Sequence, residues 1–256
     1  MITLIAESKT MSTPHDIPSD LYMAHRPLYE EKADMIMTSL RKMTQPQLAQ
    51  VIGISANMAR YSAGCIYNFA DKLSGIQALE AFTGVVFKAL DPASLPADVR
   101  KRACRSLRII SSLYGWLRPD DVIKPYRFDF NTKLAPKEET FMKYWKKDVT
   151  IALVKMIKEN ADREVLNLLP ADASKCIDWK LVKNFAKVYV AEFKRQDGDT
   201  LRTPHAGRLK ELRGTLLRDI LMNDVATAEE LCGLSGNEYI AQGEMKYPGH
   251  FVYLTD

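Results

Sequence analysis

The stretch SSLYGWLRPDDVIKPYRFDF, Ser111–Phe130, directs the interpretation of the chain because it sets six tyrosine, tryptophan, lysine and arginine residues around two prolines and a glycine. Gly115 permits a tight or positive-φ backbone, and Pro119 and Pro125 disfavour a continuous helix. The pattern therefore predicts a shaped loop that displays guanidinium and phenol groups. Because such groups bind phosphates and stack on bases, this loop is the first candidate for function. The six residues are Tyr114, Trp116, Arg118, Lys124, Tyr126 and Arg127.

The same stretch also has a structural interpretation. Tyr114 and Trp116 are large aromatic residues of the kind that fill protein cores. Arg118 lies close in sequence to Asp120 and Asp121, and either carboxylate could pair with it. Residue types alone do not decide between a binding loop and a packed one.

The distribution of charge is more informative than its total. The chain has 256 residues and a net charge of +4, which is too small by itself to indicate a nucleic-acid-binding protein. Residues 97–127 contain eight basic and three acidic residues, so this window alone carries a net charge of +5. A basic window of this kind favours an anionic partner.

Cysteine and histidine usage indicates neither a metal site nor a disulfide framework. Cys65, Cys104, Cys176 and Cys232 are widely separated, no C-x-x-C occurs, and the four histidines lack metal-ligand spacing. No glycine-rich phosphate loop follows the first apolar run. That run, MITLIA, is too short for a signal peptide, and no segment is long enough to cross a bilayer. We therefore expect a cytoplasmic protein without metal, cofactor or membrane partner.

The first apolar run is typical of a buried strand, because Met1–Ala6 is rich in apolar and β-branched residues. It leads into Glu7-Ser8-Lys9-Thr10. Polar loops that leave buried strands often carry ligand-binding groups in α/β folds. An ordinary strand exit is the alternative interpretation.

Periodicity and local signals predict the remaining elements. Thr44 followed by Gln47 matches a capping box, Ser55 can cap the next helix, and Asp197-Gly198 is a hairpin turn signal. Helices are expected at 28–41, from 44, at 55–69, 98–107, 140–160 and 206–223, and strands at 109–110, 165–168, 186–193, 200–203, 239–242 and 249–254. Ala81–Leu90, AFTGVVFKAL, is expected to be a strand or a strand-turn element interrupted at Gly84. The chain is therefore expected to form a single α/β domain over residues 1–256, with a mixed sheet and several helices.

Several segments, in the same order along the chain, resemble the bacterial YaaA family of peroxide-stress proteins. The most specific is S-x-L-Y-G-x-L-R-P at 111–119, followed by P-Y-R at 125–127. K-T at 9–10, F-T-G-V-V-F at 82–87, N-L at 167–168 and R-G at 213–214 are similar to other landmarks of the family. A-E-S at 6–8 replaces the family's Ser-Pro-Ala, and L-P-A-D at 169–172 replaces its Ala-Ser-x-Glu-Tyr. The chain therefore resembles a diverged member.

The resemblance implies a single α/β domain with a positively charged cleft that binds DNA. It also implies a role in limiting peroxide damage by lowering available iron, and a helix–hairpin–helix-like element. For that element, Ile110, Leu113, Gly115 and Trp116 match the apolar and first glycine positions, whereas Leu117 stands at the second glycine position. No cluster of iron ligands is evident, so any effect on iron is expected to be indirect.

Two functional hypotheses follow. The first is DNA binding to duplex or distorted DNA without sequence specificity, since no helix-turn-helix or zinc-finger pattern is present. The expected nucleic-acid-binding residues are Lys9, Arg118, Lys124, Tyr126, Arg127, Lys210 and Arg213, with Tyr114 and Trp116 as candidates for stacking on bases. The second hypothesis is an enzyme that acts on a nucleotide, a nucleoside or a nucleic-acid end. Its phosphate-binding set would be Lys9, Arg118, Tyr126 and Arg127, with Lys9 or Tyr126 as acid or base.

Overall fold

A computed structural model describes residues 1–16, 25–71, 74–133, 139–247 and 249–256. At its centre is β1 (Ile2–Ala6), all five residues of which are buried. It pairs in parallel with β4 (Leu107–Ser111) on one side and with β7 (Glu164–Asn167) on the other. A parallel strand covered on both faces needs a nearly continuous apolar run, which is what this segment supplies. The predicted first strand is confirmed.

The main sheet is mixed and has eight strands in the order β10-β11-β8-β7-β1-β4-β5, with β9 paired to β8. Its further strands are β5 (Gly115–Leu117), β8 (Lys187–Asp197), β9 (Thr200–Arg202), β10 (Ile240–Tyr247) and β11 (His250–Thr255). The strands from β11 to β4 run parallel, and β5, β9 and β10 pair antiparallel with their neighbours. The predicted α/β class, the β8–β9 hairpin and the strands predicted at 239–242 and 249–254 are confirmed.

The order of the strands creates a switch point between β1 and β7. Within this sheet, the chain continues from β1 to β4, which lies beside β1 on the side away from β7. From β7 it continues to β8, which lies beside β7 on the side away from β1. Where connections leave neighbouring parallel strands in opposite directions, a crevice opens beyond the carboxyl ends of those strands. Ligands of open α/β sheets bind in such crevices, so this edge is where the fold favours a site.

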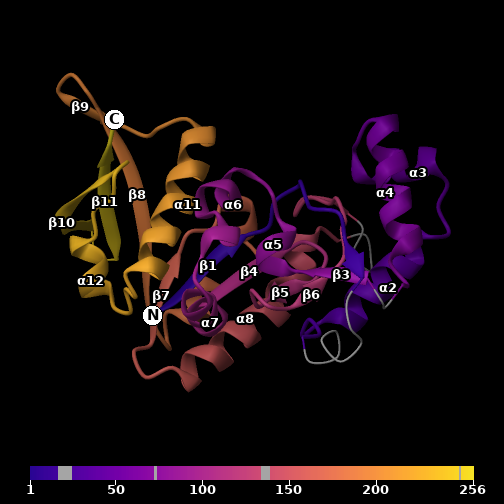
Figure 1. Ribbon diagram of the computed structural model, residues 1–256, viewed down its shortest axis with the longest axis horizontal. Coiled ribbons are helices and arrows are strands. Elements are labelled where there is room, and N and C mark those ends of the chain that lie inside the picture. Colours follow the sequence, from indigo (N-terminus) through magenta and orange to yellow (C-terminus); the bar gives the residue numbers. More distant parts are fainter. Residues whose placement is uncertain (17–24, 72–73, 134–138, 248) are drawn as a thin grey trace.

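A smaller unit extends from the sheet (Figure 1). It contains α2 (Glu30–Leu40), α3 (Gln45–Ile52) and α4 (Ala56–Asn68), at the opposite end of the molecule from β8–β11. A three-stranded sheet of β2 (His15–Asp16), β3 (Ser74–Gln77) and β6 (Val122–Ile123) accompanies it. Thr44 and Gln47 form the predicted capping box, and the Ser55 hydroxyl accepts a hydrogen bond from the Met58 N–H. Gly53, at φ 72°, turns the chain between α3 and α4.

The strand expected at 81–90 is wrong. The chain forms α5 (Ala78–Ala81) and then α6 (Val85–Leu90), against which α11 (Ala206–Met222) packs. A Cβ added to Gly214 of α11 would lie 2.2 Å from the Val86 carbonyl oxygen, so only glycine allows the two helices to approach this closely. Tertiary packing therefore overrides the strand preference of the two valines in α6.

The remaining helices complete the cover of the sheet. They are η1 (Pro92–Ser94), α7 (Ala97–Ser106), α8 (Phe141–Glu159), α9 (Ala171–Ser174), α10 (Trp179–Val182) and α12 (Ala228–Gly233). In α8, Trp145 is fully buried and its Nε1 donates a 2.7 Å hydrogen bond to the Ser112 carbonyl oxygen. The helix predicted at 140–160 is therefore confirmed, and its buried face belongs to the core.

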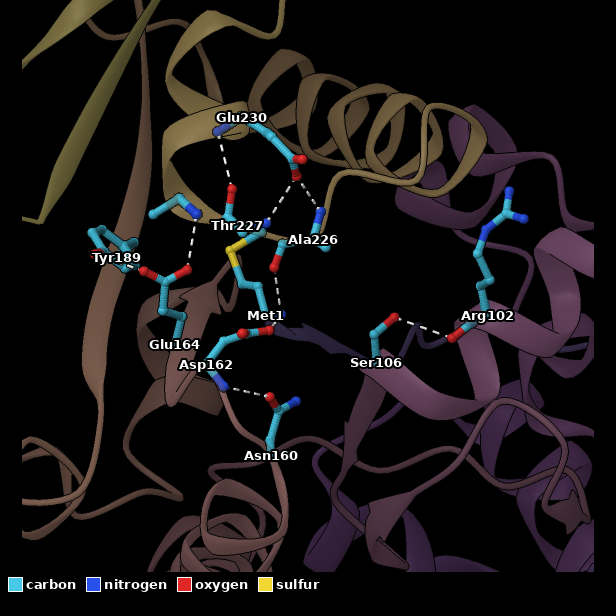
Figure 2. A network of polar contacts seen from close by, with 11 residues as sticks. Met1, Arg102, Ser106, Asn160, Asp162, Glu164, Tyr189, Ala226, Thr227 and Glu230 are labelled. Atoms are coloured by element: carbon cyan, nitrogen blue, oxygen red, sulfur yellow. Dashed lines mark hydrogen bonds and ion pairs between the residues drawn. The ribbon is translucent and has the colours of Figure 1, made fainter.

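Polar contacts fix the amino end of β1 (Figure 2). The Met1 amino group donates a 2.6 Å hydrogen bond to the Ala226 carbonyl oxygen and lies 3.5 Å from Asp162 Oδ2. Just beyond Ala226, Thr227 and Glu230 form the capping box of α12. These contacts anchor the start of the central strand, while its carboxyl end faces the switch point.

Candidate functional site

The Ser111–Phe130 segment is packed into the core. Tyr114, Trp116 and Tyr126 are 2%, 5% and 2% exposed. Residues 107–117 form the hairpin β4–β5, in which Gly115 has φ 69° and a Cβ would lie 2.5 Å from the Trp145 ring. The expectation of a loop that displays its aromatic groups is wrong, and the structural interpretation is confirmed. The rings of Tyr114 and Trp116, the stacking candidates, are covered by protein.

Two of the expected basic site residues lie in this packed region. Arg118 Nε is 2.9 Å from Asp121 Oδ1 and 3.4 Å from Asp120 Oδ1, as the structural interpretation anticipated. Lys124 is 6% exposed, and its Nζ donates a 2.9 Å hydrogen bond to the Phe69 carbonyl oxygen. Burial raises the pKa of Asp121 to about 6, against the opposing effect of Arg118. The structure does not bring Arg118 or Lys124 to the switch point.

A hollow of about 330 Å³ opens at the switch point, and we call it the strand-end hollow. Its walls come from the segment after β1, the segment after β7, the start of α6 and one face of α11. Three of the expected site residues, Lys9, Lys210 and Arg213, meet there although they lie near opposite ends of the sequence. The lining residues are Ile5, Ala6, Glu7, Ser8, Lys9, Thr10, Gly84, Val85, Val86, Phe128, Asp129, Phe130, Leu168, Pro170, Asp172, Lys210 and Arg213.

The three cations differ in how they are held. Lys9 Nζ pairs with Asp129 Oδ2 at 2.5 Å, and Arg127 Nη1 donates a 2.9 Å hydrogen bond to the Lys9 carbonyl oxygen. Lys210 is exposed. The half-buried Arg213 has neither a hydrogen bond nor an ion pair with any residue that the structure describes. Burial lowers the pKa of its guanidinium, and the charge of Asp172 opposes that shift. Arg213 is thus a desolvated cation without a direct partner, beside open volume.

Glu7 is the functional candidate that sequence reasoning missed. Its Oε2 accepts a 2.9 Å hydrogen bond from the Ser112 N–H and a second, very short one from the Tyr126 hydroxyl. The Tyr126 hydroxyl also lies 2.6 Å from Ser111 Oγ. Burial raises the pKa of Glu7 to about 7, although these hydrogen bonds oppose the shift. A carboxyl group that titrates near neutrality therefore lines the strand-end hollow, with Tyr126 behind it.

The charge of the hollow is balanced between the two signs. Three basic residues line it, together with the carboxyl groups of Glu7, Asp129 and Asp172. Lys9 and Asp129 are paired, and Glu7 is neutral below the raised pKa. The positively charged cleft stays a prediction.

A second hollow of about 330 Å³ adjoins the first, and we call it the hairpin hollow. It is lined by residues 52–55 between α3 and α4, by Met58 and by Arg127, and it shares Lys9, Phe128 and Asp129 with the strand-end hollow. This short turn joins α3 to α4, and the two helices pack against each other. The helix–hairpin–helix-like element expected at Ile110–Leu117 is wrong, since those residues belong to the β4–β5 hairpin.

Among the residues that the structure describes, no group of three or more His, Cys, Asp or Glu side chains is arranged to hold a metal ion, and the absence of a metal stays a prediction. Of the helices in the same part of the chain, none combines the length and apolar character needed to cross a membrane.

Comparison with known proteins agrees with the resemblance seen in the sequence. The family model of the peroxide stress protein YaaA matches residues 1–245. A UPF0246 protein of Parabacteroides distasonis is 26% identical over 258 residues, which cover 100% of both chains. A UPF0246 protein of Shewanella woodyi is 30% identical over 236 residues, 90% of each chain, and one of Bacteroides thetaiotaomicron is 30% identical over 241 residues, 92% of this chain and 91% of the relative. The chain therefore belongs to the YaaA family of peroxide stress proteins, whose curated relatives carry the name UPF0246.

Proposed function

We propose that this protein acts in the peroxide response by binding DNA without reading its sequence, and that it limits iron-driven oxidative damage in that response. The proposed DNA surface runs from the hairpin hollow across Lys9 and Arg127 to Lys210 and Arg213 in the strand-end hollow. Peroxide stress is the property of the family. DNA binding and the effect on iron are our proposals for this chain.

The observation that carries the proposal is the convergence of cations from distant segments on one edge of the fold. Lys9 follows β1, Arg127 follows β6, and Lys210 and Arg213 project from α11. Phosphate neutralisation by lysine and arginine supplies most of the affinity of non-specific DNA binding. Four such side chains beside two adjoining hollows fit a phosphate backbone that follows them.

The turn between α3 and α4 supports the same surface. Gly53 adopts φ 72°, and nothing lies within 4 Å of the Cβ that it lacks, so the backbone here faces open space. The Gly53 and Ile54 N–H groups both donate to the Ala49 carbonyl oxygen, so the donors available to an anion are those of the first turn of α4. A phosphate bound at the start of α4 would lie beside Lys9 and Arg127, because Ser55 lines the same hollow as they do.

Fluorescence anisotropy with duplex, bubble and single-stranded DNA, over about 50 to 200 mM salt, tests the proposal. The informative variant is Lys9→Glu/Lys210→Glu, because both side chains are exposed and their reversal leaves the core intact. Lys155→Glu/Lys187→Glu is the matched control. Lys155 lies toward the end of α8 and Lys187 begins β8, near the amino ends of the parallel strands.

We expect the DNA affinity of the wild type to fall steeply with salt. Lys9→Glu/Lys210→Glu should bind at least about 10-fold more weakly, and its plot of log affinity against log salt concentration should be shallower by about two units of slope. The control should bind like the wild type. Wild-type affinity in Lys9→Glu/Lys210→Glu, or no binding of any DNA at low salt, would overturn the proposal.

An enzyme that acts on a nucleotide or a nucleic-acid end is the second candidate. The observation that favours it is Glu7, which lines the hollow and is held by Tyr126, since acids and bases with pKa values near neutrality suit proton transfer. Incubation with nucleoside mono-, di- and triphosphates, followed by mass spectrometry, tests for conversion. Turnover that Glu7→Ala abolishes would establish this candidate, whereas unchanged substrates throughout would remove it.

A further inference from the structure

The strand-end hollow has the features of a site for one small anionic group. Its volume of about 330 Å³ lies at the lower end of the range for small-molecule pockets, about 300–1,000 Å³. A DNA duplex cannot enter a space of this size. Only a small molecule or the end of a strand can reach Glu7.

Arg213 supplies a cation suited to such a group. It is half-buried, lines the hollow and has no direct partner among the residues described. The arginine fork matches phosphate oxygens in a bidentate manner, and a desolvated guanidinium gains more from an anion than an exposed one does. Lys210 lies one helical turn earlier on α11 and lines the same space.

Glu7 would repel such an anion if it were ionised. In its neutral form it is a hydrogen-bond donor instead. The hydrogen bonds from the Ser112 N–H and the Tyr126 hydroxyl both end on Oε2, so neither of them occupies Oε1. Phosphate monoesters carry up to two negative charges, whereas the phosphodiesters within a strand carry one, so the monoester gains most from a protonated Glu7.

We propose that the strand-end hollow binds a phosphate monoester, with Arg213 and Lys210 holding the anion and Glu7 donating a hydrogen bond to it from a proton that is taken up on binding. The inference rests on the proposed phosphate-binding surface and names the ligand of one part of it. The monoester could be a free mononucleotide or the phosphorylated end of a DNA strand.

Binding is then coupled to pH through one group. The proton moves from solvent to Glu7 as the ligand binds, because a dianion beside a carboxyl group favours its neutral form. The other titratable groups that face the hollow or lie behind it are Lys9, Tyr126, Asp129, Asp172, Cys176, Lys210 and Arg213. Glu7→Gln leaves all of them in place and mimics the neutral carboxyl group.

The test is isothermal titration calorimetry in buffers of different ionisation enthalpy, with adenosine 5′-monophosphate, adenosine, and an unstructured oligonucleotide with and without a 5′-phosphate. At about pH 7.5 we expect the wild type to take up roughly half a proton or more per monoester bound. Between about pH 7 and pH 8.5 its affinity should fall about 10-fold relative to that of Glu7→Gln, which should take up none at this site. The ligand's own titration is common to both proteins and cancels in the comparison.

Arg213→Ala should lose at least about 10-fold in monoester affinity, and Arg105→Ala, an exposed arginine of α7, should lose none. A preference for the mononucleotide or for the phosphorylated strand end identifies the source, and either result upholds the site. Equal binding of phosphorylated and unphosphorylated ligands, or the same pH dependence in wild type and Glu7→Gln, would overturn it. If one of these two contradicting results were found while duplex binding remained intact and salt-dependent, only this inference would be wrong. The proposed DNA surface would still stand.

Discussion

The Ser111–Phe130 segment and the strand-end hollow differ in role: the segment is mainly packed structure, whereas the hollow holds the proposed binding groups. The segment has the more distinctive sequence, yet Tyr114, Trp116 and Tyr126 are buried and Arg118 is paired. The hollow is built from ordinary-looking residues far apart in the sequence, yet Arg213 lies beside open volume without a direct partner among the described residues. A dense motif can thus specify how strands and helices pack, while the reactive groups meet only once the chain has folded.

The two regions meet at both ends of the segment. Ser112 and Tyr126 donate hydrogen bonds to Glu7, and Phe128, Asp129 and Phe130 line the hollow. The segment therefore serves the candidate site as a support. Removing side chains from the segment should act on stability, and removing them from the hollow should act on binding.

The largest expected effect is on stability, at Gly115. In Gly115→Ala the new Cβ would meet the Trp145 ring at 2.5 Å, in a backbone with φ 69°. Overpacking and the left-handed conformation together should lower the free energy of unfolding by about 4 kcal/mol. Urea denaturation measures this change.

Gly198→Ala is the matched control for that change. Gly198 has φ 58° in the exposed β8–β9 turn, and nothing lies within 4 Å of its missing Cβ. Alanine there should cost only about 1 kcal/mol, the conformational part of the effect. Equal losses at the two glycines would show that the packing of Gly115 on Trp145 does not hold the segment in place.

Two arginine variants should separate stability from binding: replacing Arg118 should lower stability, and replacing Arg213 should lower DNA affinity. Arg118→Ala leaves the 2% exposed Asp121 side chain without its cation and should cost about 2 kcal/mol of stability, with little change in DNA affinity. Arg213→Ala removes no hydrogen bond or ion pair with a described residue and should change stability by less than about 0.5 kcal/mol, but DNA affinity should fall. Thermal unfolding and anisotropy on the same samples measure both. If Arg118→Ala weakened DNA binding more than Arg213→Ala did, the division between the regions would be wrong.

Glu7 gives a smaller, pH-dependent effect on stability. Its pKa is raised from 4.5 to about 7 in the folded protein, so folding takes up a proton between these values. The stability that it contributes therefore falls as pH rises from about 4.5 through about 7, the opposite of a salt-bridged carboxylate. Glu7→Gln should gain about 2 kcal/mol relative to wild type between about pH 5 and pH 8. A stability difference that does not vary with pH would mean that the pKa of Glu7 is the same in the folded and unfolded protein.

Much of the fold is predictable from local signals. The apolar run of β1, the capping box at Thr44 and the turn at Gly198 all depend on residues close together in sequence. The segment 81–90 was not predictable, because its helix depends on α11. Gly214 lets α11 approach Val86, and the Ser8 hydroxyl accepts a 3.0 Å hydrogen bond from the Gly84 N–H. Neither contact is visible in the pattern AFTGVVFKAL.

The candidate site was predictable only in part. The resemblance to a family pointed to Lys9, Lys210 and Arg213, which meet at the strand-end hollow. Glu7 was missed because its properties come from Ser112 and Tyr126, more than a hundred residues away. Its place directly after a buried parallel strand was the one available signal, since the carboxyl ends of such strands gather ligand-binding groups.

Backbone amide NMR of the 29.0 kDa wild-type protein, titrated with a 5′-phosphorylated single-stranded oligonucleotide, tests the division between the two regions most directly. Our account predicts that shift changes gather at residues 6–10, 168–172 and 207–214, extend to residues 52–55, and spare residues 114–124. Shifts concentrated in residues 114–124, with the strand-end residues unmoved, would contradict it and would return the binding surface to the packed segment.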